Sequence, residues 1–276
     1  MPKILNGKLV RDEIMADLKK RIEILNVVPT LAIVMIGNNP DSEVYVKMKI
    51  NFAKKIGVNA FVVSFSEEKI TQEILLACIE KLNNDKSVHG IIIQSPLPAP
   101  LDWEVAVEKI APKKDVDGMQ GNITPATARG VLSLLNYYKI PVVGKKAVVM
   151  GRSRLVGKPI TELMRKSGAE VEVVHSQTLE PEKITRTADV LIVAIGKPEL
   201  VGAESIKEGV VIIDVGITSV LIRDKDGVES KKIYGDVDFD SVKDIVSAIS
   251  PVPGGVGPMT VASLFQNLIE SCECSS

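Results

Sequence analysis

Residues 146–159, KAVVMGRSRLVGKP, decide the fold of this chain. The apolar run Lys146–Met150 leads into a turn that contains Gly151 and Gly157, and a helical pattern follows. Dinucleotide-binding domains use this order of strand, glycine turn and helix N-terminus, because backbone N–H groups and the helix dipole then meet the pyrophosphate. The spacing here is G-x-S-x-x-x-G-x-P and not G-x-G-x-x-G. An ordinary strand–helix turn is therefore the alternative interpretation.

The end of the next expected strand, Glu170–Val174, indicates which dinucleotide is bound. NAD sites carry Asp or Glu there, about 20 residues after the glycines, to bind the ribose 2′-hydroxyl. This strand is followed by His175-Ser176-Gln177, which contains no acid, and Arg152 and Arg154 lie in the preceding glycine turn. A 2′-phosphate is tolerated at such a site, so NADP is favoured. Alternatively, both arginines are simply solvated.

Strands and helices alternate along both halves of the chain, which predicts an α/β fold with parallel sheets covered on both faces. The 276 residues are enough for two domains. We expect strands over 31–36, 60–65, 90–93, 146–150, 170–174, 190–194 and 210–215, and a hairpin over 221–234 that turns at Asp226-Gly227. We expect helices over 9–25, 42–56, 73–82, 126–138, 239–249 and 258–270.

Composition excludes several classes of protein. The net charge is −1, from 34 basic and 35 acidic residues, and aromatic residues make up 4%. This balance gives no electrostatic footprint for nucleic acid or an anionic membrane. No apolar stretch is long enough to span a bilayer, and the N-terminus is not a secretory signal. The three cysteines, Cys78, Cys272 and Cys274, indicate neither a disulfide framework nor a metal site, and they fit a reducing cytoplasm.

Four residues in the first half form a candidate catalytic group. Tyr45 and Lys49 lie four residues apart and share one face of the expected 42–56 helix with Ser42. A lysine on an inward face is partly desolvated, which lowers its pKa and suits it to proton transfer. Gln94 ends the 90–93 strand, and Asp117 could accept two hydrogen bonds from an amino-pyrimidine-like group. The alternatives are a snorkelling lysine, a glutamine that satisfies loop backbone and an ordinary Asp-Gly turn.

A rigid segment, PVPGGVGPMT, occupies residues 251–260 and leads into the last expected helix. Its prolines fix the path of the backbone and its glycines allow close approach to a ligand. This pattern favours a loop whose backbone N–H groups face a ligand, the alternative being a tight connector before the helix.

Taken together, these motifs resemble the bifunctional methylenetetrahydrofolate dehydrogenase/methenyltetrahydrofolate cyclohydrolase family over nearly the whole chain. The resemblance implies two α/β domains flanking a cleft, the second a Rossmann-like NADP-binding domain. Residues 1–118 and 256–276 would form the folate-binding catalytic domain, and residues 119–255 the NADP-binding domain. It also implies oxidation of 5,10-methylenetetrahydrofolate by NADP, and hydrolysis of the resulting 5,10-methenyltetrahydrofolate to 10-formyltetrahydrofolate.

The resemblance also assigns roles to individual residues. Lys49 would be the acid/base of the hydrolytic step, held by Gln94, while Tyr45 would stack on the folate and Asp117 would bind its pterin edge. Further folate contacts would come from Pro253, Gly254, Gly255 and Thr260. Cofactor contacts would come from Gly151, Arg152, Ser153, Val156, Gly157, Ser176, Ala194, Gly196, Gly216 and Ile217.

Beyond the site, the resemblance implies a cytoplasmic homodimer that acts in one-carbon metabolism and purine biosynthesis. The sequence departs from the family at Ser95, usually leucine, and in a shortened stretch between Gly118 and Pro125. The shortened stretch keeps a dehydrogenase-only member of the family as an alternative. Two other classes remain: an NADP-dependent oxidoreductase of shikimate-dehydrogenase-like layout, and a nucleotide-sensing binding protein without catalysis.

Overall fold

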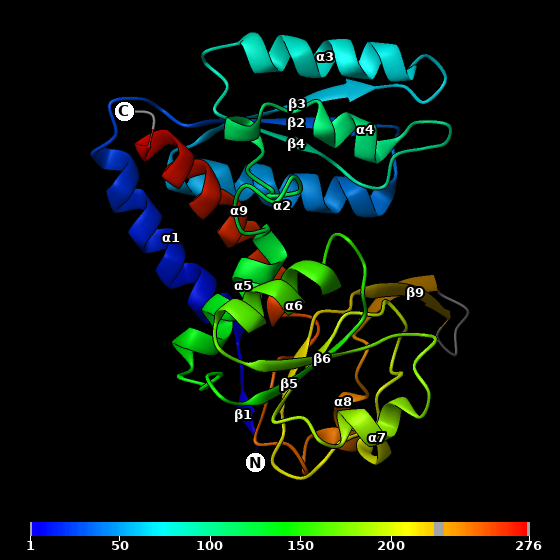
Figure 1. The fold of residues 1–276 in the computed structure, drawn as a ribbon. Helices are drawn as coiled ribbons and strands as arrows, with labels where there is room; N and C mark the ends of the chain where they lie inside the picture. The colour runs from blue at the N-terminus through cyan, green and yellow to red at the C-terminus, as the bar shows by residue number, and fades with distance from the viewer. Residues whose placement is uncertain (1, 224–228, 275–276) are drawn as a thin grey trace. The chain divides into compact units, whose positions relative to one another are not determined.

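The structure, a computed structural model, describes residues 2–223 and 229–274 and consists of two compact units (Figure 1). The three-stranded unit comprises Asp12–Ala126 and Val261–Ser276. The six-stranded unit comprises Met1–Arg11 and Thr127–Thr260. Each unit is named for the parallel sheet at its centre, and each is described separately below.

The sheet of the three-stranded unit has the order β3-β2-β4, with β2 at Thr30–Ile36, β3 at Asn59–Phe65 and β4 at Gly90–Ile93. Both strand pairs are parallel. Residues Leu31–Ile36 of the central strand are buried on both faces, as a parallel strand covered by helices requires.

Alternate residues of β2 pack into two separate cores. Leu31, Ile33 and Met35 join the core formed with helices α1, α2 and α9. Ala32 and Val34 join the core formed with α3 and α4 on the other face. Figure 1 shows α3 and α2 on opposite sides of this sheet. The helices are α1 (Gly7–Glu23), α2 (Pro40–Ile56), α3 (Gln72–Asn84), α4 (Trp103–Glu108) and α9 (Val256–Glu273), with a 3₁₀ turn η1 at Pro112–Lys114.

Helix α2 has well-defined signals at both ends. The Asn39 side chain accepts hydrogen bonds from the backbone N–H groups of Asp41 and Ser42, which satisfies donors that the first turn leaves free. At the other end Gly57 adopts φ 82° and its N–H donates to the Ala53 carbonyl. The helix therefore begins two residues before the expected position and ends where the sequence predicts.

The sheet of the six-stranded unit has the order β1-β11-β8-β7-β5-β6, and every neighbouring pair is parallel. The chain runs from β5 outward to β6 and then crosses back to β7 on the other side of β5. In open α/β sheets, ligands bind outside the carboxyl ends of the strands at such a reversal. The strands are β1 (Lys3–Ile4), β5 (Lys146–Met150), β6 (Glu170–Val174), β7 (Val190–Val193), β8 (Val211–Asp214) and β11 (Ala248–Ile249), with α5 at Ala126–Tyr137, α6 at Gly157–Lys166, α7 at Pro181–Thr185, α8 at Phe239–Val242 and η2 at Ala203–Ser205.

Two features of this unit differ from the sequence analysis. The expected helix over 239–249 is wrong: only Phe239–Val242 is helical, and Ala248–Ile249 forms β11 between β1 and β8. Residues Ala248 and Ile249 are buried, and short apolar runs of this kind do not distinguish a strand from a helix. The first eleven residues group with the six-stranded unit, whereas the sequence analysis placed them in the first domain, because β1 pairs with β11.

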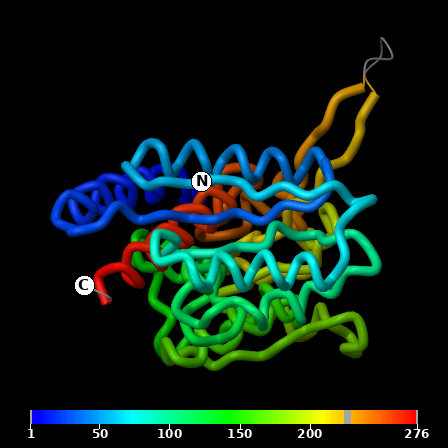
Figure 2. The backbone as a smooth tube through the Cα atoms, turned by 90° about the horizontal axis from the view of Figure 1, so that it is seen from above, coloured from blue at the N-terminus to red at the C-terminus, as the bar shows by residue number. Residues whose placement is uncertain are grey.

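A separate two-stranded hairpin follows β8 in the chain. Strand β9 (Thr218–Arg223) pairs antiparallel with β10 (Glu229–Tyr234). The expected turn at Asp226-Gly227 lies outside the described residues. Figure 2 shows the two strands, yellow to orange, extending away from the six-stranded sheet.

Candidate active site

A lysine and a glutamine meet at the carboxyl edge of the three-stranded sheet. Lys49 lies on α2, and Gln94 follows the last residue of β4, whose ladder it extends by donating its backbone N–H to the Val34 carbonyl. The Lys49 Nζ donates to Gln94 Oε1 at 2.8 Å. The structure thus brings together two of the residues that the sequence analysis paired.

The Gln94 side chain is fixed from both ends. Its Nε2 donates to the Ser95 carbonyl at 2.9 Å, which leaves Oε1 as the acceptor for Lys49. The buried Ser42 hydroxyl donates to the same carbonyl at 3.3 Å. The contact is made by the Ser95 backbone and not by its side chain, and it leaves Gln94 Oε1 to accept from Lys49.

Asp117 belongs to the same group and lies in a tightly constrained turn. The neighbouring Asp115 carboxylate, 2% exposed, accepts hydrogen bonds from the backbone N–H groups of Met119 and Gln120. Gly118 adopts φ 76°, and a Cβ there would lie 2.8 Å from the Pro125 Cα. The shortened stretch after Gly118 is therefore a closed turn, and it leaves Asp117 within electrostatic range of Lys49.

Burial shifts the pKa values of Lys49 and Asp117. Desolvation lowers the pKa of Lys49 below its ordinary value of 10.5, and the nearby Asp117 opposes that shift. Desolvation likewise raises the pKa of Asp117, against the influence of Lys49. Both changes favour neutral forms, and a neutral amine is the form that can accept a proton.

This environment predicts the pH dependence of any reaction in which Lys49 accepts a proton. The rate should rise with pH as the ammonium is deprotonated, and the midpoint of the rise should lie below 10.5, because burial disfavours the charged form. Initial rates of that reaction, corrected for the uncatalysed reaction at each pH, measure this part of the pH profile. Its persistence in Lys49→Gln would show that another group titrates.

Tyr45 lies one helical turn before Lys49 on α2 and is half-buried. Its burial raises the pKa of the phenol, and Asp41 adds to the shift, so the side chain stays neutral at physiological pH. A neutral aromatic ring beside the lysine provides an apolar surface on which a planar ligand can stack.

The sequence analysis missed the residues that hold Asp117 in place. The sequence analysis singled out neither Asp115 nor Asn267 of α9. Asn267 is 3% exposed, and its Nδ2 donates to the carbonyls of Val116 at 2.9 Å and Thr124 at 3.1 Å. An amide in the middle of an apolar helix is the signal that was available, because a buried polar group needs partners.

Asn267→Ala should lower the free energy of unfolding by about 1–3 kcal/mol, because it leaves buried carbonyls without their donor. It should also lower the rate of any reaction that uses Asp117, since Val116 and Thr124 lie on either side of it. Ser271→Ala is the matched control. The Ser271 side chain also lies on α9 and donates to a backbone carbonyl, that of Lys113, but this hydrogen bond is exposed. Urea denaturation compares the two, and equal small losses would contradict the anchoring role.

In the six-stranded unit, Gly151 and Gly157 form the predicted phosphate-binding turn. Gly151 follows β5 with φ 121°, and a Cβ there would collide with the Ala194 carbonyl oxygen at the end of β7. A Cβ on Gly157, the first residue of α6, would collide with the Gly151 carbonyl oxygen. Both positions require glycine for close backbone packing at the point where the strand order reverses.

The other predicted cofactor residues lie in this turn or follow β6, β7 and β8. The Ser153 hydroxyl accepts from the Gly157 N–H at 3.2 Å, close to Val156 at the start of α6. Arg152 donates to the Gln177 side chain at 3.0 Å, next to Ser176 after β6. The guanidinium therefore lies where the sequence analysis placed the 2′-phosphate. The remaining four predicted residues follow the neighbouring strands, Ala194 and Gly196 after β7 and Gly216 and Ile217 after β8.

The rigid 251–260 segment also lies in the six-stranded unit. Gly254 adopts φ 114°, and its carbonyl accepts from the Gly7 N–H at 2.9 Å. Gly255 donates its N–H to the Pro251 carbonyl at 2.7 Å. Both glycines therefore serve close packing against the start of α1, and the Gly255 N–H is already engaged within the protein. The other predicted folate contacts here are Pro253 and Thr260, whose hydroxyl lies 3.4 Å from that of Thr127.

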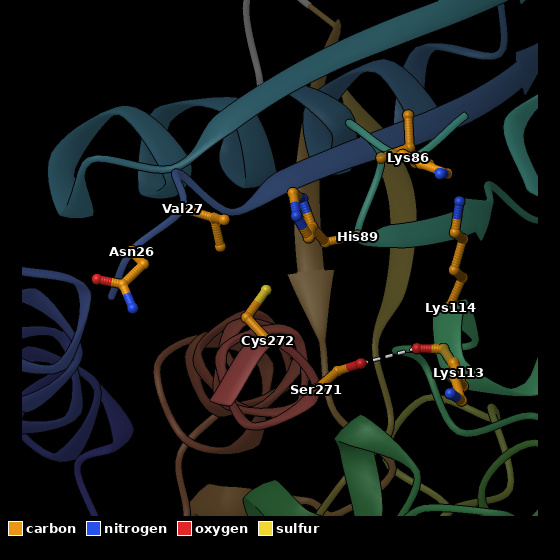
Figure 3. Close-up of a pocket in the computed structure, with 9 residues that line it drawn as sticks. Asn26, Val27, Lys86, His89, Lys113, Lys114, Ser271 and Cys272 are labelled. Atoms are coloured by element: carbon orange, nitrogen blue, oxygen red, sulfur yellow. Dashed lines mark hydrogen bonds between the residues drawn. The ribbon is translucent and has the colours of Figure 1, made fainter. Parts of the chain in front are cut away.

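A cavity of about 470 Å³ lies at the opposite, amino-terminal edge of the three-stranded sheet (Figure 3). Its lining includes Lys114, whose ammonium donates to three carbonyls at the end of α3, and His89, whose Nδ1 accepts from the Thr30 N–H. Burial and Glu273 raise the pKa of the lining residue Cys272 to about 11, which makes it a poor nucleophile. These side chains are engaged in the fold, so this cavity is not the candidate site.

Within residues 2–223 and 229–274, no group of His, Cys, Asp and Glu side chains could hold a metal ion. The described helices include none that is long and apolar enough to cross a membrane.

The two units define a two-domain α/β protein, with a glycine turn at the strand-order reversal of one sheet and a half-buried lysine in the other domain. Residues 5–117 match the tetrahydrofolate dehydrogenase/cyclohydrolase catalytic domain, and residues 125–276 match the NAD(P)-binding domain of the same family. The chain belongs to this family. The predictions of family and of a two-domain α/β fold with an NAD(P)-binding domain are thus confirmed.

Full-length relatives agree with this assignment. The chain is 41% identical to the bifunctional protein FolD of Methanoculleus marisnigri, over 98% of this chain and 96% of that protein. The crystal structure of the bifunctional FolD of Campylobacter jejuni is 39% identical, covers all of both chains and has a TM-score of 0.93. The FolD of Trypanosoma brucei, solved with NADP and an inhibitor, is 34% identical with a TM-score of 0.93, over 100% of this chain and 99% of that one.

Proposed function

We propose that this chain oxidises 5,10-methylenetetrahydrofolate with NADP and hydrolyses the product, 5,10-methenyltetrahydrofolate, to 10-formyltetrahydrofolate. The observation that carries the proposal is the hydrogen bond from the half-buried Lys49 to Gln94, with Asp117 within electrostatic range. These residues lie within or at the edge of the match to the family's catalytic domain. A desolvated lysine held by an amide is suited to the proton transfers that hydrolysis needs.

Hydride transfer needs little acid–base chemistry from the protein. When bound, NADP accepts the hydride that leaves the methylene carbon, and a methenyl cation remains. The residues of this chain bind and orient the two reactants. The turn at Gly151, the start of α6 and Arg152 would receive the phosphates of the cofactor, and the absence of an acid after β6 favours NADP over NAD.

Hydrolysis of the cation needs a group that accepts a proton from water, and Lys49 is that group. As water forms a C–O bond to the methenyl carbon, the Lys49 amine takes a proton from that water. The bond from this carbon to N5 then breaks, and the hydroxyl proton of the adduct moves to N5 as the formyl C=O forms. The proton held by Lys49 returns to solvent. A group in this position contributes about 10²–10⁴-fold to the rate.

The neighbouring side chains bind the folate and support the lysine. Gln94 holds the Lys49 amine, and its own position is fixed through Ser95. Asp117 would accept hydrogen bonds from the amino-pyrimidine edge of the pterin, while Tyr45 would stack on the ring system. Further folate contacts are proposed from Pro253, Gly254, Gly255 and Thr260.

A spectroscopic assay of the purified chain tests both activities together. With 5,10-methylenetetrahydrofolate and NADP, NADPH should form while methenyltetrahydrofolate stays low, because the chain removes it faster than the uncatalysed reaction does. A parallel reaction with NAD should be slower. NADPH and methenyl rising in equal amounts would support a dehydrogenase-only enzyme, and no reduced cofactor would contradict the proposal of hydride transfer.

We further propose that the protein acts as a cytoplasmic homodimer that supplies one-carbon units for purine biosynthesis. The family resemblance supports the dimer, and the three free cysteines, Cys78, Cys272 and Cys274, are consistent with a reducing compartment. Light scattering during size-exclusion chromatography should give twice the subunit mass, and a monomer at micromolar concentration would contradict the dimer.

A further inference from the structure

Two aspartates lie buried beneath the cofactor-binding edge of the six-stranded sheet. Asp214 ends β8 and is 3% exposed, and Asp236 follows β10 and is 0% exposed. Buried carboxylates are costly unless their oxygens accept hydrogen bonds. Neither residue takes part in the reactions proposed above, so their burial needs another explanation.

Asp236 supports the loop that follows β7. Its Oδ2 accepts hydrogen bonds from the backbone N–H of Ile195 at 2.6 Å and that of Gly196 at 2.9 Å. Its Oδ1 is buried and has no hydrogen-bond partner among the described residues. Asp236 therefore acts through one oxygen, and that oxygen fixes two consecutive N–H groups of a cofactor loop.

Asp214 supports the loop that follows β8 and also holds Asp236 in place. Its Oδ1 accepts from the N–H groups of Gly216 at 3.0 Å and Asp236 at 3.1 Å. Its Oδ2 accepts from the Val237 N–H at 3.0 Å. Asp214 thus uses both oxygens as acceptors, which distinguishes it from Asp236.

The network continues to the rigid 251–260 segment. The Asp214 N–H donates to the Ser250 hydroxyl at 2.8 Å, and that hydroxyl lies 3.3 Å from the Asp214 carbonyl, to which it donates in turn. Ser250 directly precedes Pro251. The loops after β7 and β8 are therefore joined through one buried pair of carboxylates, and the loop after β11 is joined to them through the backbone of Asp214.

Two glycines provide the space that this pair needs. A Cβ on Gly216 would collide with the Asp236 carboxylate, and a Cβ on Gly235 would collide with Asp214 Oδ2. Gly235 directly precedes Asp236 and admits Asp214, and Gly216 lies two residues after Asp214 and admits Asp236. The glycines at these two positions are thus explained by the carboxylates.

We propose that Asp214 and Asp236 are positioning residues for the nicotinamide cofactor, which hold the loops after β7 and β8 in the conformation that binds NADP. The inference rests on the proposed cofactor site, since Ala194, Gly196, Gly216 and Ile217 lie on these loops. The two aspartates act only through backbone N–H groups. Their loss should weaken NADP binding, and the loss of Asp236 should leave the chemistry of Lys49 unchanged.

The difference between the two aspartates gives an isosteric test. Asp214→Asn turns one of two engaged acceptors into a donor that faces a backbone N–H, so the Kd for NADP should rise about tenfold or more, equivalent to 1.4 kcal/mol. Asp236→Asn can keep its carbonyl toward Ile195 and Gly196 and place the amide where Oδ1 has no partner, so NADP binding should stay within about threefold. Asp236→Ala removes the acceptor and should weaken binding about tenfold or more.

Kd values are measured by calorimetry at pH 8 on variants whose thermal unfolding shows them folded. Burial raises the pKa of Asp214 to about 7, against the effect of its backbone hydrogen bonds, so its carboxylate is ionised at that pH. Asp189→Asn is the matched control, because Asp189 also accepts a backbone N–H, that of Lys146, but at the amino-terminal edge of the same sheet. If Asp214→Asn does not fold, the inference is tested by comparing the NADP Kd of Asp236→Ala with that of Asp236→Asn.

A second measurement separates positioning from general damage. Methenyl hydrolysis without NADP should be unchanged in Asp236→Asn and Asp236→Ala, because the side-chain contacts of Asp236 are with the loop after β7, whereas Asp214 is also linked through Ser250 to the rigid 251–260 segment. NADP binding within about threefold of wild type in Asp214→Asn and Asp236→Ala, or equal weakening in both asparagine variants, would overturn the inference. Failure of the proposed function would look different: the wild-type chain would bind NADP but hydrolyse nothing.

Discussion

Lys49→Gln should lower the rate of methenyltetrahydrofolate hydrolysis by about 10²–10⁴-fold. The substitution removes the amine that takes the proton from water but keeps a polar side chain of similar length opposite Gln94. NADPH formation from methylenetetrahydrofolate should fall far less, since hydride transfer depends on orientation and on the cofactor. Initial rates of both steps, measured separately on the same preparation, give the comparison.

Lys47→Gln is the control for that experiment. Lys47 lies on the same helix, but it is 73% exposed and pairs with Glu43 at 3.6 Å, so its removal costs little. Both rates should stay within about threefold of wild type. Equal loss of hydrolysis in the two variants, or normal hydrolysis in Lys49→Gln, would contradict the assignment of Lys49.

Gly151→Ala should weaken NADP binding strongly. The Cβ would collide with the Ala194 carbonyl oxygen, and alanine is strained at φ 121°. Backbone strain of this kind costs about 1–3 kcal/mol, and the collision adds to it at the reversal point of the sheet. We expect the Kd for NADP to rise by about 10-fold or more and the free energy of unfolding to fall.

Gly144→Ala separates strain from collision. Gly144 also has a positive φ, 66°, and precedes the same strand, but the described atoms leave open space within 4 Å of its Cβ position. It should lose stability to a similar strain of about 1–3 kcal/mol and bind NADP like the wild type. Calorimetry and urea denaturation of both variants distinguish the two effects, and weakened NADP binding in Gly144→Ala would point to general destabilisation.

The sequence predicted the elements that carry the site because their signals are local. Asn39 and Gly57 mark the ends of α2, and the glycines at 151 and 157 mark the phosphate-binding turn. Local patterns of this kind depend on spacing and turn chemistry alone. The pairing of Lys49 with Gln94, which lie 45 residues apart, was implied by the family resemblance and not by a local signal.

The residues that support the site could not be predicted in the same way. Asn267 binds carbonyls about 150 residues earlier in the chain, and Asp236 binds N–H groups about 40 residues earlier. Single-sequence reasoning has no access to such pairs. The same limit explains β11, whose two residues are a strand only because β1 and β8 lie on either side.

The most direct test of the account measures how much methenyltetrahydrofolate accumulates for each NADPH formed, in the wild-type chain and in Lys49→Gln. We predict a low ratio in the wild type, because the cation is hydrolysed as it forms, and a ratio near one for Lys49→Gln early in the reaction. Equal ratios in the two proteins would contradict the claim that Lys49 carries the hydrolytic step.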